Sequence, residues 1–313
     1  MTSPLFHTRA KGKLLLSGEY FVLDGALALA LPVRYGQTLE VYGGETGSEG
    51  ASLEWVSRDE QGQVWFEARY RLPDLSPLQT SDTKTAETLR AILLACRGQN
   101  PAFLMDAGTL QVTTQNDFPR AWGLGTSSTL IAALGQWADV DPYPVLFETL
   151  GGSGYDLACA YAEGPILYRL LHGQPDVQPT VFQPPFAEHL YFVYLSQKQD
   201  SREGIRRFRE KAQGRSQWVG QVSDLTRQIL AANTLAEFEK VLRSHEQLVG
   251  QALELPPVKT RLFADCPGEI KSLGAWGGDF VLATAWATEA EIRRYFEAKG
   301  FPLLLSYGDM LGV

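Results

Sequence analysis

The sequence predicts an α+β fold, because segments with strand periodicity and segments with helix periodicity are mixed without strict alternation. The first 70 residues are mostly short apolar or alternating runs separated by glycine-containing turns, a pattern typical of strands. Helical spacing is clearest at residues 127–138, where Leu130, Ile131, Leu134 and Trp137 fall on one face. With 313 residues, the chain is long enough for two ordinary domains or one large one.

The same reasoning places the other elements along the chain. We expect strands at residues 13–16, 26–33, 38–42, 109–114, 166–170, 190–196 and 280–285, and a hairpin over 52–70 that turns at 59–62. We expect helices at residues 84–96, 127–138, 155–161, 203–212, 218–232 and 235–253, and a last helix ending at Gly300. Thr234 with Glu237, and Thr288 with Glu291, have the spacing of capping boxes at helix starts.

A polar, proline-rich stretch at residues 172–185 is the expected domain junction. It predicts a first domain at residues 1–175 and a second at 186–313. The segment between the central glycine-rich loop and Asp156 is short, so we expect it to hold one helix and a turn.

Composition and charge exclude several classes of protein. The net charge of −8 argues against a general affinity for nucleic acid or anionic lipid, because such surfaces need a basic excess. No run of 18 apolar residues and no signal-peptide pattern occurs, so a cytoplasmic protein without a membrane partner is expected. The three cysteines and four histidines form no metal-binding pattern; reduced, buried thiols and a structural His245 are expected.

A glycine-rich loop runs directly into the helix at residues 127–138. Residues 119–128 read Pro-Arg-Ala-Trp-Gly-Leu-Gly-Thr-Ser-Ser. Glycines let backbone N–H groups approach an anion, and a helix N-terminus adds unpaired donors and a positive dipole. The segment therefore predicts a phosphate cradle, with a capped turn between strand and helix as the alternative. It matches neither a Walker A motif nor the dinucleotide fingerprint, whose third glycine would fall at Ser128.

Two further segments contain glycines beside charged residues. Residues 11–25 read Lys-Gly-Lys-Leu-Leu-Leu-Ser-Gly-Glu-Tyr-Phe-Val-Leu-Asp-Gly, and residues 271–280 read Lys-Ser-Leu-Gly-Ala-Trp-Gly-Gly-Asp-Phe. Alone, they indicate an edge strand with solvated lysines and a glycine-rich loop. In this order along the chain, the three segments resemble the three motifs of the GHMP kinases, which include galactokinase, homoserine kinase, mevalonate kinase and phosphomevalonate kinase.

The resemblance covers essentially the whole chain. It implies a two-domain α+β GHMP kinase fold with the active site in the cleft between the domains, where ATP and the substrate meet. A fourth segment, Gly-Gly-Ser-Gly-Tyr-Asp-Leu-Ala at residues 151–158, resembles the Gly-Ser-Gly-Phe-Asp-Val-Ala of phosphomevalonate kinases. By this match Asp156 is the catalytic aspartate, which accepts a proton from a substrate hydroxyl. A helix cap is the alternative role for Asp156.

The same resemblance implies the other site residues. Lys13 is the second catalytic residue, whose charge stabilises the transferring phosphoryl group. The implied nucleotide-binding residues are Gly123, Leu124, Gly125, Thr126, Ser127 and Ser128. Mg²⁺ is assigned to Ser127 and Glu148, although Glu148 also fits a solvated helix position. The implied substrate-binding residues are Glu19, Tyr20, Ser153, Gly154, Lys198, Ser201, Arg202, Gly277, Gly278 and Asp279.

Two residues depart from the family pattern. Thr126 replaces the commoner serine and keeps the hydroxyl. Trp276 stands where the family usually has glycine, and we expect its ring either to narrow the site or to stack on a ligand.

The resulting functional hypothesis is an ATP- and Mg²⁺-dependent kinase acting on a mevalonate-type acceptor. Tyr20, Tyr155 and Asp279 each resemble the phosphomevalonate branch, so phosphomevalonate is favoured over mevalonate. The alternatives are a kinase for a sugar or homoserine, diphosphomevalonate decarboxylase, and a non-catalytic metabolite-binding protein. The expected partner is a small-molecule substrate; a homodimer is left open.

Overall fold

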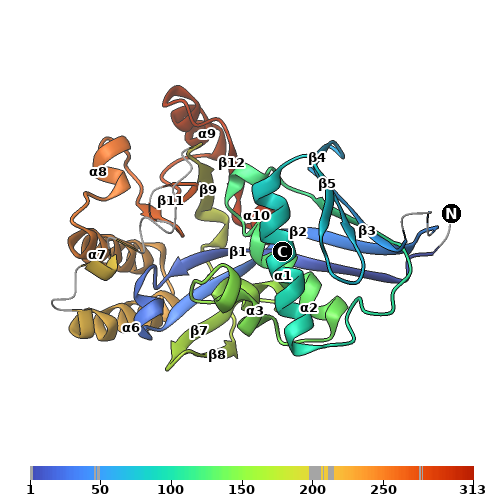
Figure 1. Cartoon of the computed structure of the whole chain (residues 1–313). Coiled ribbons are helices and arrows are strands. Elements are labelled where there is room, and N and C mark those ends of the chain that lie inside the picture. The colour runs from blue at the N-terminus through green and yellow to red at the C-terminus, as the bar shows by residue number, and fades with distance from the viewer. Residues whose placement is uncertain are drawn as a thin grey trace. The chain divides into compact units, whose positions relative to one another are not determined.

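The computed structural model describes residues 3–45, 47, 50–196, 206, 208–210, 215–274, 276 and 278–313 (Figure 1). The chain divides into two compact units. Unit 1 comprises residues 1–12, 35–120 and 125–161, and unit 2 comprises residues 13–34, 121–124 and 162–313. The strands β1 (Phe6–Ser17) and β2 (Ala28–Gly43) run from one unit into the other, so the units interleave along the chain.

Unit 1 combines a mixed sheet with a layer of helices. Its hydrogen-bonded strand order is β5-β4-β3-β6-β2, in which only the pairing of β3 with β6 is parallel among the described residues. The strands are β3 (Ser52–Arg58), β4 (Val64–Arg71), β5 (Pro77–Thr80) and β6 (Leu110–Asn116). The helices are α1 (Thr83–Gln99), α2 (Thr126–Ala138), α3 (Pro142–Thr149) and α4 (Tyr155–Tyr161). The expected hairpin is confirmed by the antiparallel pairing of β3 with β4.

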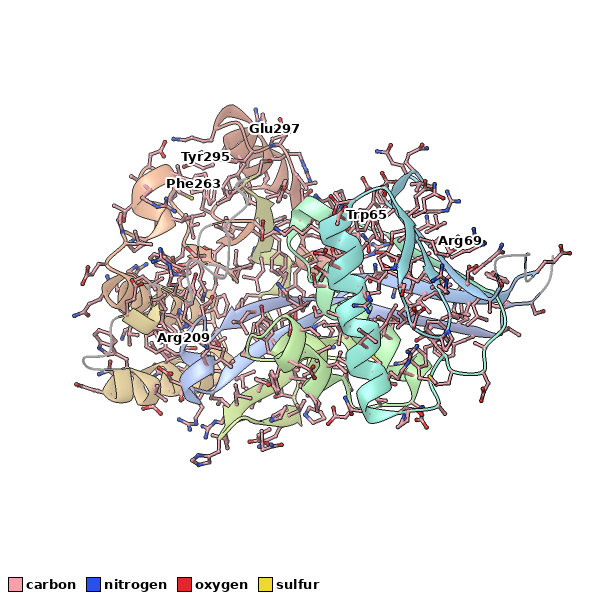
Figure 2. The ribbon with its side chains drawn as sticks, viewed as in Figure 1. Trp65, Arg69, Arg209, Phe263, Tyr295 and Glu297 are labelled. Atoms are coloured by element: carbon pink, nitrogen blue, oxygen red, sulfur yellow. The ribbon has the colours of Figure 1, made fainter. Side chains whose placement is uncertain are left out.

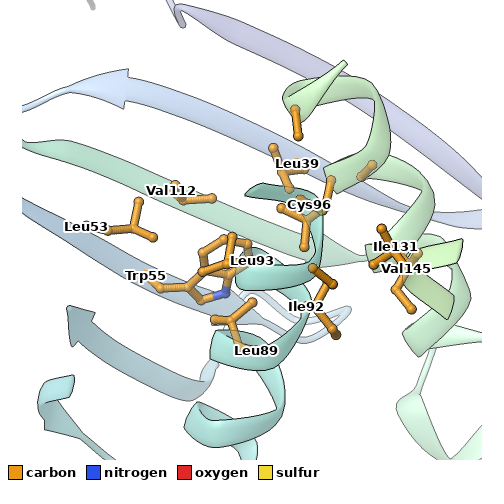
Figure 3. Packing of buried hydrophobic residues seen from close by; sticks show 14 of the residues in the cluster. Leu39, Leu53, Trp55, Leu89, Ile92, Leu93, Cys96, Val112, Ile131 and Val145 are labelled. Atoms are coloured by element: carbon orange, nitrogen blue, oxygen red, sulfur yellow. The ribbon is translucent and has the colours of Figure 1, made fainter. Parts of the chain in front are cut away.

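The core of unit 1 lies between the sheet and its helices. Leu89, Ile92 and Leu93 project from α1 toward Leu53 and Trp55 of the sheet (Figure 3). All of these side chains are almost completely removed from solvent. Their three- and four-residue spacing on α1, and the two-residue spacing on β3, are the periodicities by which each element buries one face.

Helix α3 corrects the expectation of one helix and a turn before Asp156, because two helices, α2 and α3, occupy this segment. The Asp141 side chain accepts a hydrogen bond from the N–H of Tyr143 (3.0 Å), and Pro142 occupies the first turn. An aspartate N-cap followed by proline is a helix-start signal, since proline there lacks only an N–H that would be unpaired anyway.

Unit 2 contains an antiparallel sheet in the order β10-β11-β9-β12. Its strands are β9 (Leu190–Tyr194), β10 (Ile270–Ser272), β11 (Phe280–Thr284) and β12 (Leu304–Ser306). A second group consists of β7 (Ile166–Leu171), β8 (Gln174–Pro179) and the N-terminal part of β2, which pairs with β7. The helices are α6 (Arg215–Ala231), α7 (Leu235–Leu253), α8 (Val258–Leu262), α9 (Glu289–Ala298) and α10 (Tyr307–Leu311). The 3₁₀ segments are Phe21–Asp24, Arg120–Trp122 and Ala187–His189.

Aromatic side chains pack helix α9 in unit 2. The Phe263 ring meets that of Phe296 edge-on, with 5.4 Å between centroids, and Tyr295 packs against Trp286 at 5.2 Å. Phe263 and Tyr295 are labelled in Figure 2. The start of α9 is fixed by the capping box of Thr288 and Glu291, which the sequence predicted, as it did that of Thr234 and Glu237 on α7.

Two expected elements differ from those observed. Residues 28–43 form one strand, β2, rather than two, because the chain continues without a turn through Arg34 and Gly36. Residues 174–179 form β8 within the stretch expected to be a junction. Proline does not prevent this, because β8 is the last strand in its hydrogen-bonded order, and an edge strand tolerates a missing donor.

Candidate active site

Residues from the three glycine-containing segments meet within unit 2. Lys13, on β1, donates a hydrogen bond from Nζ to the carbonyl oxygen of Gly123 (2.8 Å), and its backbone N–H donates to Leu124 (2.9 Å). The Asp279 side chain lies so close to Gly123 that a Cβ there would overlap it, and Gly123 has φ +67°. Glycine is therefore favoured at position 123 by its φ, and any side chain there would displace the Asp279 carboxylate. The contacts bring together a cation, a carboxylate and a glycine backbone, far apart in sequence.

An aromatic cluster supports this arrangement. The Trp122 ring packs edge-on against Phe280, with 5.8 Å between centroids, and Tyr194 donates a hydrogen bond to the carbonyl oxygen of Ala121 (3.0 Å). Phe280 directly follows Asp279, and Trp122 directly precedes Gly123. The packing therefore fixes the two backbones that carry the Gly123–Asp279 contact.

In unit 1, the N-terminus of α2 is suited to an anion. Gly125 is the N-cap, with φ 98° and ψ 40°, and the first turn contains no acidic residue. A glycine cap has no side chain to occupy the N–H groups of the first turn, which carry the positive end of the helix dipole. Ser127 is exposed, whereas Ser128 is buried and donates to the carbonyl oxygen of Gly125 (2.8 Å).

Asp156 lies in the first turn of α4, also in unit 1. Its Oδ1 accepts a hydrogen bond from the N–H of Leu157 (3.0 Å), and the residue is half-buried. Burial raises the pKa of Tyr143, and the Asp156 charge raises it further, so the carboxylate lies within electrostatic reach of that phenol. Ser153 is buried, and Gly154 has φ +85°, a conformation that favours glycine. The carboxylate thus makes a local backbone bond and keeps access to solvent.

The oxygen ligands assigned to Mg²⁺ are both exposed. Ser127 begins α2, and Glu148 lies near the end of α3. Within the part of the chain that the structure describes, no three His, Cys, Asp or Glu side chains gather into a metal-binding group. Hydroxyl and carboxylate oxygens fit the preference of Mg²⁺, which is usually held by few protein ligands and completed by substrate phosphates and water.

Glu19, expected to bind substrate, is fully buried in unit 2. Its carboxylate accepts a hydrogen bond from Nζ of Lys271, which is also fully buried, and its Oε2 lies 3.3 Å from Nε2 of His245. Burial raises the pKa of Glu19, opposed by the Lys271 charge, and lowers the pKa of His245 well below its usual value. This geometry gives Glu19 a role inside the unit: it pairs the first motif with the third.

A second carboxylate extends this buried network. Glu246, on α7, accepts hydrogen bonds from Ser272 Oγ (2.9 Å) and from the indole N–H of Trp276 (3.0 Å), and lies 3.9 Å from Lys271 Nζ. Burial raises the pKa of Glu246 to about 7, with a further contribution from the Glu19 charge. Sequence reasoning missed Glu246 and Lys271 as a pair, because nothing in their spacing indicates that α7 and β10 are neighbours.

Trp276 occupies neither of the positions expected for its ring. The side chain is buried in a cluster with Phe21, Val249 and Leu253 rather than projecting as a wall or stacking platform. Tyr20 belongs to the same cluster, with its ring 5.9 Å from that of Phe208. Gly278 is also buried. Lys198, Ser201, Arg202 and Gly277, and most of the helix expected at 203–212, lie outside the described residues.

Two other expectations about individual residues are confirmed. His245 is fully buried, and the three cysteines are unpaired thiols in buried positions. Among the described helices, none combines the length and apolar character needed to cross a membrane.

Searches against family models and against curated protein sequences gave no match. Solved structures do match over nearly the whole chain. Mevalonate kinase from L. major, in complex with R-mevalonate, is 15% identical, with 98% of each chain covered and a TM-score of 0.66. Phosphomevalonate kinase from Streptococcus pneumoniae, in complex with phosphomevalonate and AMPPNP, is 15% identical, covers 96% of this chain and 100% of its own, and has a TM-score of 0.69.

Mevalonate diphosphate decarboxylase from Staphylococcus aureus is 13% identical, with 94% of this chain and 90% of its own covered and a TM-score of 0.58. At these identities the likeness establishes the fold. The chain therefore has an α+β fold like that of these mevalonate kinase and phosphomevalonate kinase structures, as its motifs predict.

Proposed function

We propose that this protein is an ATP-dependent kinase that transfers the γ-phosphoryl group to a mevalonate-type acceptor, with phosphomevalonate favoured over mevalonate. The observation that carries the proposal is the meeting of Lys13, Gly123 and Asp279 in unit 2. A protein that only shared the fold would not need a half-buried contact that aligns residues from all three motifs.

Lys13 is proposed to stabilise the transferring phosphoryl group, and the start of α2 is proposed to bind nucleotide phosphates. A lysine held by a backbone carbonyl points in a fixed direction, and fixed charges stabilise a transition state without reorganising. The N–H groups of the first turn of α2 would donate hydrogen bonds to phosphate oxygens. Charge neutralisation on the nucleotide phosphates is the chemistry that Mg²⁺ supplies in such reactions, and Ser127 and Glu148 are the residues proposed to hold it.

Asp156 is proposed to act on the acceptor. For a hydroxyl acceptor, its carboxylate would take the proton as the oxygen attacks. For a phosphate acceptor this is unnecessary, because a phosphate oxygen is already ionised at neutral pH. A phosphorylated acceptor also needs cationic partners to offset desolvation of its charge. Lys198 and Arg202 are the candidates from the sequence motif.

The alternatives are weaker on specific grounds. The decarboxylase has a Tyr-Trp-Gly-Lys type of sequence in its first motif, where this chain reads Ser17-Gly18-Glu19-Tyr20. A non-catalytic binding protein would not need Lys13, Ser127 and Asp156 together. A sugar kinase would need sugar-binding residues near the N-terminus, which the sequence does not show.

The experiment is a measurement of kcat/KM for phosphomevalonate and for mevalonate on one preparation, with homoserine and galactose in the same ADP-release assay. We expect phosphomevalonate to be preferred. A preference for mevalonate of more than about tenfold, or roughly 1.4 kcal/mol in the transition state, would make the enzyme a mevalonate kinase. Turnover with homoserine or galactose alone would move it out of the isoprenoid branch.

A further inference from the structure

The third glycine-containing segment is a hairpin connection with an unusual residue at its centre. It joins β10 to β11, and its base is closed by the hydrogen bond from Leu273 N–H to the carbonyl oxygen of Phe280 (3.3 Å). Trp276 has φ +54°, in the left-handed region, where a bulky side chain is rarely found. Such a conformation is strained for a bulky residue and persists only when the surroundings enforce it.

Three contacts enforce it here. The indole N–H donates to Oε1 of Glu246 (3.0 Å), and the ring is 4% exposed within the apolar cluster on α7. The edge of the ring lies against Gly250, where a Cβ would stand 3.2 Å from Trp276 Cη2 and 2.8 Å from the carbonyl oxygen of Leu255. Gly250 thus leaves the space that the indole fills.

Glu246 accepts hydrogen bonds from two points of the connection between β10 and β11. One carboxylate oxygen accepts from Ser272, the last residue of β10, and the other accepts from Trp276. The hydroxyl of Ser272 can donate or accept, so this arrangement also survives protonation of the carboxylate. Lys271, which pairs with Glu19, is the neighbour of Ser272, so the anchor continues into the first motif.

We propose, on the basis of the kinase function above, that Trp276 and Glu246 are positioning residues. They hold the backbone at Leu273 and Trp276 before any ligand binds, so that Asp279 is already seated at Gly123, whose carbonyl oxygen Lys13 contacts. A glycine at position 276 would leave this backbone free to move. The conformational entropy lost when the backbone became ordered would then reduce the binding free energy of the ligand. Trp276, which replaces the glycine usual in the family, therefore positions the backbone of the site without contacting the ligand.

The test compares Trp276→Gly with Trp276→Phe, and uses Trp55→Phe as the matched control. Trp55 is equally buried, and its indole N–H donates to the Ser57 hydroxyl (3.0 Å), but it lies in the core of unit 1. Hydrogen exchange of the amides at positions 273 and 276 is measured first. We expect at least tenfold faster exchange in Trp276→Gly, a smaller increase in Trp276→Phe, and none in Trp55→Phe.

Steady-state kinetics, well below each variant's melting temperature, provide the second readout. Trp276→Gly should raise KM for ATP or for the acceptor about tenfold, equivalent to about 1.4 kcal/mol, with kcat within about threefold of the parent. Glu246→Ala should give the same split, and Glu246→Gln should restore parental values because its amide can still accept from Trp276 and donate to Ser272.

Unchanged amide exchange at positions 273 and 276 in Trp276→Gly would overturn the proposal. A rise in KM in the control Trp55→Phe as large as that in Trp276→Gly would also overturn it. If the parent protein transfers no phosphoryl group, the proposed function fails. The exchange comparison then still decides whether the anchor exists, since it requires no substrate.

Discussion

The catalytic role of Lys13 stays a prediction, to which the structure adds a contact. The sequence singled it out by its place in the first motif, and the structure holds its ammonium group on the Gly123 carbonyl. The burial of Glu19 and Lys271 could not be foreseen in the same way. Their pairing joins positions 252 residues apart, which no local pattern encodes.

Replacement of Lys13 by methionine keeps most of the length of the side chain and removes its charge. If the charge acts on the transferring phosphoryl group, kcat should fall by roughly 10²-fold or more while nucleotide affinity stays close to that of the parent. Turnover kinetics measure the fall in kcat, and calorimetric titration with ATP measures the nucleotide affinity. Full turnover with weakened acceptor affinity alone would make Lys13 a substrate clamp.

Asp156→Asn separates chemistry from helix capping. Asparagine keeps the size and can still accept the hydrogen bond from the Leu157 N–H, so the melting temperature should change little. If the carboxylate is the base for a hydroxyl acceptor, kcat with mevalonate should fall roughly 10²–10⁴-fold. A large fall in melting temperature with near-normal turnover would assign Asp156 to capping instead.

Glu246 should make folding stability depend on pH in a specific direction. Its folded-state pKa, about 7, lies above its ordinary value of 4.5, so the folded chain holds a proton that the unfolded chain has lost. The stabilisation is complete below about pH 4.5 and is lost as pH rises through about 7. His245 acts in the opposite sense, because its lowered pKa means that the unfolded chain binds the extra proton below pH 6.5.

Glu246→Gln isolates this effect, since His245, Glu19 and Lys271 remain in both proteins. The stability of the parent relative to the variant should fall by about 1.4 kcal/mol per pH unit between about pH 5 and 7, and then become flat. Urea unfolding at several pH values measures it. A difference that is constant across this range would show that the Glu246 carboxyl titrates normally.

At the scale of elements, helices were predicted more accurately than strand continuity. Helices α4 and α7 have the predicted bounds, because their apolar spacing and caps are local signals. Strand β2 was split in the prediction at Arg34–Gln37, since glycine and charged residues usually interrupt strands. Pairing with β7 over residues 28–30, with β6 over residues 37–43 and with β1 stabilises the whole strand, and the sequence does not show these partners.

The start of α2 offers a matched pair of adjacent serines. Ser127→Ala removes an exposed hydroxyl and should leave stability unchanged while weakening Mg²⁺-dependent nucleotide binding. Ser128→Ala removes the buried bond to Gly125 and should cost about 1 kcal/mol of stability. Thermal melts and titrations with ATP, with and without Mg²⁺, compare the two. Equal nucleotide affinity in Ser127→Ala and the parent would exclude Ser127 as a metal ligand.

For the whole molecule, the order of three weak motifs predicted the fold correctly, and the matching kinase structures support it at 15% identity. Each motif alone fits an ordinary turn or loop. Their combination is informative because the fold must bring them together, and in unit 2 Lys13, Gly123 and Asp279 do meet. The acceptor was harder to predict, because specificity depends on a few cationic side chains whose positions no local pattern determines.

The central claim is phosphoryl transfer from ATP to a mevalonate-type acceptor. The most direct measurement follows the ³¹P NMR spectrum of ATP, Mg²⁺ and phosphomevalonate with the purified protein. The account predicts that ADP and a new diphosphate ester appear in equal amounts, and that Lys13→Met slows both together. It would be contradicted if neither phosphomevalonate nor, in a parallel sample, mevalonate were phosphorylated, or if diphosphomevalonate supplied in a third sample with ATP were instead consumed with release of ADP, inorganic phosphate and carbon dioxide.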